Sequence, residues 1–150
     1  MNKTAYCLPL LLALAASAQA QEQPINDACP QLPADADLLW QHKATPTSDF
    51  CRALRADGSE AFGLYIASQS PFKPSRSDRA EQASIDGRDV TWYRSELATR
   101  PGMQARETLL ELPDGRVAHI WVQASSEAQL GEAIGQTKAL HFQSARLSSK

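Results

Sequence analysis

The chain lacks the short motifs that usually mark an enzyme or a cofactor-binding protein. It contains no G-x-S-x-G nucleophile elbow, no phosphate-binding loop and no C-x-x-C pair, and its 150 residues show no internal repeat. Basic residues are not in excess either, since 15 Lys and Arg accompany 17 Asp and Glu. A formal net charge of -2 does not suit a protein that neutralises phosphates. We therefore expect neither a nucleic acid nor an anionic membrane surface as a partner.

Long apolar runs are also missing, apart from one short run at the start of the chain. Lys3 precedes an apolar stretch over residues 8–16, and the small residues Ala18 and Ala20 form a cleavage site. The stretch is shorter than the about 20 residues that a membrane-spanning helix needs. We expect a signal peptide over 1–20 that is cleaved after Ala20, and a periplasmic or secreted mature protein without membrane insertion.

Removal of residues 1–20 leaves about 130 residues, which is the size of one domain. Lys3 is the only charged residue in this segment, so the formal net charge changes from -2 to about -3. The sequence predicts an extended, proline-rich arm over 21–33, a single α+β domain over 34–142 and a polar tail over 143–150.

Cysteine is scarce, and Cys7 leaves with the signal peptide. The remaining pair, Cys29 and Cys51, indicates a disulfide, because exported proteins meet an oxidising environment. Such a bond closes a loop of about 20 residues and stabilises the fold by roughly 3 kcal/mol in the chain-entropy model. A metal or redox pair is the alternative, although no histidine cluster lies beside either cysteine in the sequence.

Short segments rich in aromatic and branched residues predict about six strands, separated in pairs by three hairpin turns. The turns are Asp57-Gly58, Asp86-Gly87 and Pro113-Asp114-Gly115. The predicted strands lie within 50–56, 60–68, 81–85, 89–94, 103–112 and 116–124. A meandering antiparallel sheet is the expected arrangement.

Two segments have helical spacing. Leu32, Ala36, Leu39 and Trp40 predict a short amphipathic helix over 34–43. Near the C-terminus, Ser125 or Ser126 can cap a second helix, in which Leu130, Ala133, Ile134 and Thr137 share one face. The predicted fold class is thus α+β, with the C-terminal helix on one face of the sheet and a short N-terminal helix elsewhere.

The hairpin turns also predict which strand residues share a face, because alternate residues point to opposite sides. Each hairpin then has one apolar face, which we expect the C-terminal helix to cover. The apolar faces hold Cys51, Ala53, Phe62, Leu64 and Ile66; Ala83, Ile85, Val90 and Trp92; and Leu110, Leu112, Ala118, Ile120 and Val122. The opposite, mixed face holds Phe50, Tyr65, Thr91, Tyr93, Glu107, Leu109, Glu111, His119 and Trp121.

The run from "IDGRDVTWYR" through "ETLLELPDGRVAHIWVQASS" into "EAIGQTKALHF" resembles the closing half of PsbP-like domains. In that family, antiparallel strands lead into a helix that ends in a short apolar-aromatic segment, here Leu140-His141-Phe142. The resemblance covers about half the chain and implies an α/β/α sandwich that serves as an accessory or binding module. It transfers no functional residue, and the early helix and the cysteine pair have no counterpart in it.

Chemistry at the mixed face has two interpretations. His119 lies opposite Leu109 in the predicted register, with Glu107 and Glu111 as diagonal neighbours at roughly 7–8 Å before the side chains lean. An acid-base pair needs direct hydrogen-bond reach, so a polar sheet face with cross-strand charges is the simpler interpretation. His42, His119 and His141 have no ligand spacing, so we expect no metal and no cofactor.

The expected function is therefore non-enzymatic, and no residue is assigned a catalytic role. Aromatic side chains gathered on one surface favour a protein partner, unless the N-terminal helix covers them. The candidate binding residues are Tyr65, Tyr93, Glu107, His119 and Trp121. The basic loop with Lys73, Arg76 and Arg79 is either a solvated connection or a contact for an acidic partner or an anionic glycan. An inhibitor or immunity protein that offers acidic groups to an enzyme is one specific form, and a small hydrolase that uses His119 and a glutamate is the alternative.

Overall fold

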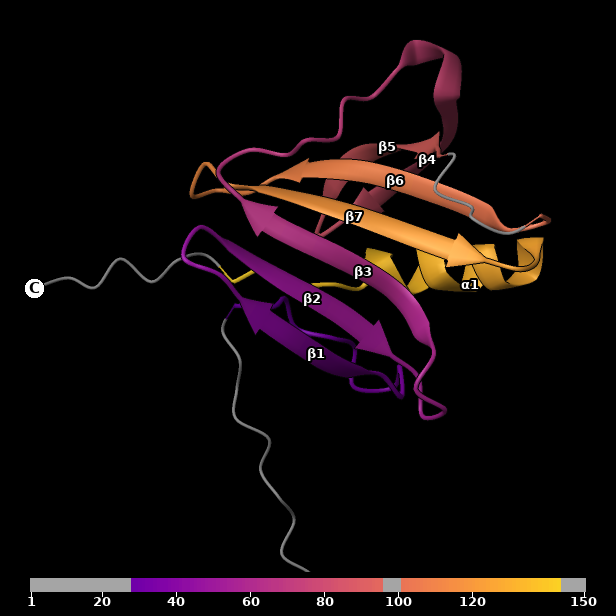
Figure 1. Cartoon of the computed structure of the whole chain (residues 1–150), viewed down its shortest axis with the longest axis horizontal. Helices are drawn as coiled ribbons and strands as arrows, with labels where there is room; N and C mark the ends of the chain where they lie inside the picture. Colours follow the sequence, from indigo (N-terminus) through magenta and orange to yellow (C-terminus); the bar gives the residue numbers. More distant parts are fainter. Residues whose placement is uncertain (1–27, 96–100, 144–150) are drawn as a thin grey trace, which may run out of the picture.

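The computed structural model describes residues 28–95 and 101–143. These residues form an antiparallel sheet of seven strands in the order β1-β2-β3-β7-β6-β5-β4, with helix α1 behind it (Figure 1). The elements are β1 (Leu39–Ala44), β2 (Ser48–Leu54), β3 (Glu60–Ala67), the 3-10 turn η1 (Arg76–Asp78), β4 (Arg79–Ile85), β5 (Arg88–Arg94), β6 (Gln104–Glu111), β7 (Val117–Ala124) and α1 (Glu127–Lys138). The predicted signal peptide, most of the arm and most of the tail lie outside the described residues.

The three predicted hairpins are confirmed. They join β2 to β3, β4 to β5, and β6 to β7, all antiparallel. At the second turn, both Asp86 and Gly87 have positive φ angles, 51° and 73°, which a two-residue turn of this twist requires. The predicted register also holds, because Cys51 pairs with Leu64, Ala83 with Val90, and Leu110 with Ala118.

The predicted N-terminal helix over 34–43 is wrong. Residues 39–44 form strand β1, which pairs with β2 along its whole length and makes the sheet seven-stranded rather than six-stranded. The apolar residues that suggested a helix also fit a strand, because their exposure alternates along the chain: Leu38 is buried, Leu39 is 56% exposed and Trp40 is half-buried. Without β1, the backbone groups along the outer side of β2 would lack partners, so strand pairing overrides local preference. Asp37, in a left-handed conformation with φ of 47°, directs the chain into this strand.

Helix α1 covers the apolar face of the sheet, as predicted. Ser126 caps its N-terminus, with Oγ accepting a hydrogen bond from the Gln129 backbone N–H at 3.2 Å. The four residues predicted to share its inner face are buried: Leu130, Ala133, Ile134 and Thr137. They close a core that contains Trp92, Phe62, Leu64, Ile85 and Ile120, all without measurable exposure.

The predicted disulfide is confirmed between Cys29 and Cys51, both buried. It ties the segment before β1 to strand β2. The same segment is held by Trp40, whose Nε1 donates to the Pro30 carbonyl at 2.7 Å, and by an isolated antiparallel bridge between Gln31 and His141. The N-terminal segment therefore belongs to the folded domain.

The core predicts the effect of one truncation. Changing Ile120 to Ala removes buried methyl groups from the middle of β7, so the free energy of unfolding should fall by about 2–5 kcal/mol. Chemical denaturation measures this loss. Leu39→Ala is the matched control, because Leu39 is mostly exposed and its truncation should change stability by less than about 0.5 kcal/mol. Equal denaturation midpoints for the two variants would contradict the assignment of the core face.

Candidate functional site

All five predicted binding residues lie on the face opposite α1. Strand pairing places them in two rows that cross the sheet. Tyr93, Glu107, Trp121 and Gly63 form the first row, on β5, β6, β7 and β3. Leu109, His119, Tyr65 and Phe50 form the second row, on β6, β7, β3 and β2. The structure therefore brings the predicted residues together.

The connection between β3 and β4 lies across part of this face. Strands β7, β6 and β5 separate β3 from β4, so the chain must pass these strands to reach the far edge (Figure 1). Phe72 in this connection stacks on His119, with ring centroids 5.0 Å apart and planes within 7°, and meets Tyr93 edge-on at 6.0 Å. We call the six rings Phe50, Tyr65, Phe72, Tyr93, His119 and Trp121 the aromatic face.

Sequence reasoning missed Phe72. Its signal was present, because Phe72 is the one large apolar residue in the polar stretch 68–79. The stretch also carries the basic residues Lys73, Arg76 and Arg79. Phe72 covers the mixed face at β7 and β5, and within residues 28–95 and 101–143 no helix lies over this face at β1 and β2.

His119 and Glu107 form a direct hydrogen bond, with His119 Nε2 and Glu107 Oε1 2.9 Å apart. The two residues are diagonal neighbours, as predicted, and their side chains lean together until they touch. Both are largely shielded, since the side chains are 13% and 9% exposed. Burial lowers the pKa of His119 below its usual 6.5, against an opposing effect of Glu107 that raises the pKa. The ring is therefore neutral at pH 7, and it donates from Nε2 to the glutamate.

This pair has the reach that general acid-base catalysis needs. Its surroundings do not suit a substrate, however, because the Phe72 ring lies parallel to the imidazole and occupies the space in front of it. The hydrogen bond to His119 also gives the buried Glu107 carboxyl a partner. The arrangement is that of a satisfied polar pair beneath an aromatic cover.

Trp121 packs against the backbone of β3. A Cβ atom added to Gly63 would overlap the indole ring, so only glycine leaves room for the tryptophan. The indole Nε1 donates to Glu60 Oε1 at 2.9 Å, and Glu60 Oε2 accepts from Arg52 Nε at 2.6 Å. The Phe50 ring lies 5.2 Å from Trp121. Trp121 is therefore fixed in place, with its polar atom satisfied.

The side of the aromatic face near β1 and β2 is the accessible one. Among the described residues, the exposed large apolar side chains are Leu39 at 56% and Phe50 at 38%. In the register of β1 and β2, Leu39 lies opposite Leu54 and Phe50 lies opposite Lys43, all on the side of the sheet away from α1. Phe50, next to Trp121 and Tyr65, is thus open to a partner, and the hydrogen-bonded pair Gln41 and Arg52 separates it from Leu39 on the same face.

The three histidines do not come together. His42 contacts Asp49 at 2.9 Å and His141 contacts Asp86 at 3.3 Å, each apart from the His119 pair. Within residues 28–95 and 101–143, no group of three or more His, Cys, Asp or Glu side chains is placed to hold a metal ion. The same residues contain no helix long and apolar enough to cross a membrane.

Comparisons with protein-family models, with curated proteins and with solved structures find no match to this chain.

The lowered pKa of His119 predicts a pH dependence of stability. Because the unfolded chain binds a proton on this ring near pH 6.5 and the folded chain does so only at lower pH, the stabilisation is complete above about pH 6.5. This stabilisation is lost progressively as the pH falls below about 6.5 and through the lower pKa that His119 has in the folded protein. Denaturation midpoints at pH 7.5 and 5.5 should therefore differ more for the wild type than for His119→Gln. His141→Gln is the control, since His141 is largely exposed; the same pH dependence in all three proteins would contradict the prediction.

The contact of Trp121 with Gly63 predicts a coupled pair of mutations. Gly63→Ala should lower the free energy of unfolding by about 1–3 kcal/mol, because the added methyl group displaces the indole. In a Trp121→Ala background the same change should cost much less, since the obstructing ring is gone. A double-mutant cycle from chemical denaturation measures this coupling. Purely additive losses would show that the indole does not rest on Gly63.

Proposed function

We propose that this protein is exported and acts as a non-enzymatic binding protein, with the aromatic face as its contact surface for another envelope or secreted protein. The observation that carries the proposal is that Leu39 and Phe50, the exposed large apolar side chains of the described residues, lie on the same side of the sheet. Phe50 adjoins Trp121 and Tyr65, with ring centroids 5.2 Å and 6.3 Å away, and aromatic residues are enriched in the centres of protein interfaces.

Export is supported by two features of the chain. Residues 1–20 have the charge, apolar stretch and small residues of a signal peptide. The disulfide between Cys29 and Cys51 is compatible with an oxidising compartment such as the periplasm or the exterior. An inhibitor or immunity protein is a specific form of this proposal, and Glu111 is an exposed carboxylate on the same face that such a protein can offer.

A hydrolase is the second candidate, and the 2.9 Å contact between His119 and Glu107 is the observation that favours it. It is the weaker candidate because Phe72 stacks on the imidazole. In a screen for hydrolytic activity, loss of turnover in His119→Gln with an unchanged circular dichroism spectrum would favour the hydrolase over the binding protein.

A charged substitution on the accessible side tests the binding surface. Affinity purification from the exported fraction, quantified by mass spectrometry, should recover a partner with the wild type and lose it with Phe50→Asp. A buried aromatic anchor contributes at least about 1–2 kcal/mol, so capture should fall by about fivefold or more. Lys138→Asp, an exposed change on α1 behind the sheet, is the matched control and should leave capture unchanged. Equal capture by Phe50→Asp and the wild type would contradict the proposal.

A further inference from the structure

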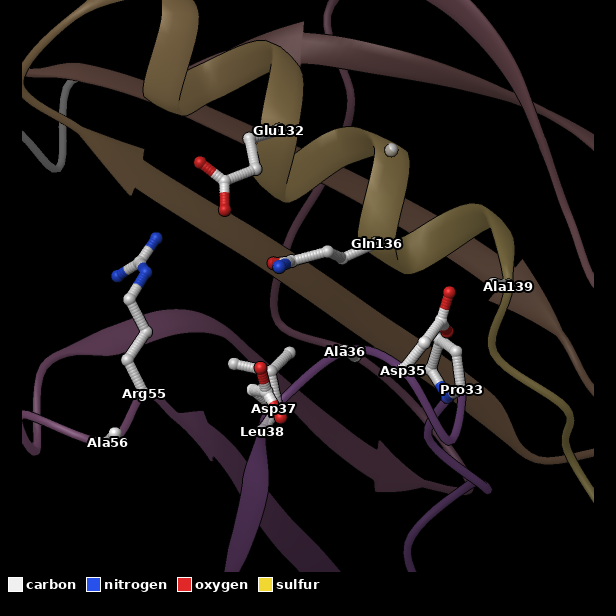
Figure 2. A pocket seen from close by; sticks show the side chains of 11 residues that line it. Pro33, Asp35, Ala36, Asp37, Leu38, Arg55, Ala56, Glu132, Gln136 and Ala139 are labelled. Atoms are coloured by element: carbon white, nitrogen blue, oxygen red, sulfur yellow. The ribbon is translucent and has the colours of Figure 1, made fainter.

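A separate cavity, open to solvent, lies on the other side of the sheet, between helix α1 and the chain segment that leads into β1, and its three carboxylate side chains are exposed. Its volume is about 590 Å³, within the range of small-molecule sites. Gly135 and Gln136 line it from the helix, Pro33 and residues 35–38 line it from the N-terminal segment, and Arg55 lies at one end (Figure 2). None of these residues belongs to the aromatic face.

One end of the cavity has opposite charges on facing walls. The Arg55 guanidinium and the Glu132 carboxylate extend toward each other in Figure 2, yet within the described chain Arg55 has no carboxylate within 4.0 Å. One nitrogen of Arg55, Nη1, is anchored, since it donates to the Glu60 carbonyl at 2.8 Å and to Ser59 Oγ at 3.3 Å. Its Nε and Nη2 make no hydrogen bond to the described residues. Arg55 also interacts electrostatically with Asp57 in the turn between β2 and β3. Its free Nε and Nη2, with the Glu132 carboxylate on the facing wall, suit a ligand that carries both a carboxylate and an amine.

Further carboxylates line the rest of the cavity. Asp35 lies at the end away from Arg55, and Asp37 lies between them along the lower wall (Figure 2). The lining thus has one cation and three carboxylates, which a ligand with one carboxylate and two amines complements. Gln136 extends between the two ends, and its Oε1 is buried without a hydrogen-bond partner among the described residues.

The walls of the cavity are held by covalent and backbone contacts. The disulfide fixes Cys29, and the Gln31 N–H donates to the His141 carbonyl at 2.8 Å, just after α1. Ala36 N–H donates to the Pro33 carbonyl at 3.1 Å and closes the turn. A cavity formed by fixed segments loses little freedom when it binds a ligand.

We propose that this cavity binds a free basic amino acid of the lysine type. Arg55 receives the carboxylate, Glu132 and Asp37 receive the α-ammonium group, and Asp35 receives the amine at the end of the side chain. The small side chain of Ala36 leaves space for the aliphatic chain between the two charged ends (Figure 2). This site is independent of the proposed protein-binding surface.

Three related compounds test each part of the recognition by isothermal titration calorimetry at pH 7.5. L-lysine carries every group, L-norleucine lacks the terminal amine, and 1,5-diaminopentane lacks the carboxylate. Lysine should bind most tightly. The Kd of each of the other two compounds should be higher by about tenfold or more, because each compound lacks one charge-assisted contact. Equal affinities for the three compounds, or a Kd for lysine weaker than about 1 mM, would overturn the proposal.

Substitutions on the helix separate loss of binding from loss of folding. A Cβ added at Gly135 meets no atom within 4 Å, so Gly135→Leu should fold and fill the cavity. Gly131→Leu is the matched control, because Gly131 lies in the same helix with equal space around it but does not line the cavity. Lysine binding should be lost in Gly135→Leu and kept in Gly131→Leu. Both variants should unfold at denaturant concentrations no lower than the wild type, since leucine favours a helix more than glycine does.

The charged ends are tested one at a time. Asp35→Asn should weaken lysine binding by about tenfold to the level of norleucine and leave norleucine binding unchanged. Arg55→Gln should weaken binding of lysine and norleucine and leave 1,5-diaminopentane unaffected. Lysine binding that persists in both variants and in Gly135→Leu would place the ligand elsewhere and overturn the proposal.

Discussion

The pairing of β3 with β7 is the contact on which the rest of the structure depends. It joins two sets of strands that are each local in sequence, β1-β2-β3 and β4-β5-β6-β7. On one side of the sheet this pairing sets Leu64 beside Ile120 in the core beneath α1. On the other side it sets Tyr65 beside His119 and Gly63 beside Trp121, which creates the aromatic face. A register shift of one residue between these two strands would exchange core and surface along both.

Local features of the fold were predictable from the sequence because their causes lie within a few residues. The two Asp-Gly pairs and Pro113-Asp114-Gly115 determine hairpins, the hairpins determine register, and the register assigns each side chain to a face. The C-terminal helix was predictable from its cap and its apolar spacing. The disulfide followed from the cysteine count and the signal-like start.

The remaining features depend on contacts between distant residues. Strand β1 exists because it pairs with β2, and its own sequence fits a helix equally well. The order of the strands, which separates β3 from β4, follows from no local pattern, so the position of Phe72 over His119 was not predictable. The hydrogen bond between His119 and Glu107 required side chains to lean across a diagonal, which register alone does not determine. The cavity behind the sheet needed the N-terminal segment to be placed beside α1.

The long connection between β3 and β4 has a consequence for the order of assembly. The first three strands, with the disulfide that ties Cys29 to Cys51, lie before the connection, and the other two hairpins lie after it. We expect each part to form its hairpins first and the β3–β7 pairing to form later, because this pairing brings together residues about sixty positions apart, such as Trp121 and Glu60. During that interval the β3 edge is unpaired, and an unpaired strand edge is a site of aggregation. Phe72 lies in the connection and packs on Tyr93 and His119 in the second part. When the β3–β7 pairing forms, we therefore expect the connection to settle over the His119–Glu107 pair in the same step, so that the two parts become one domain.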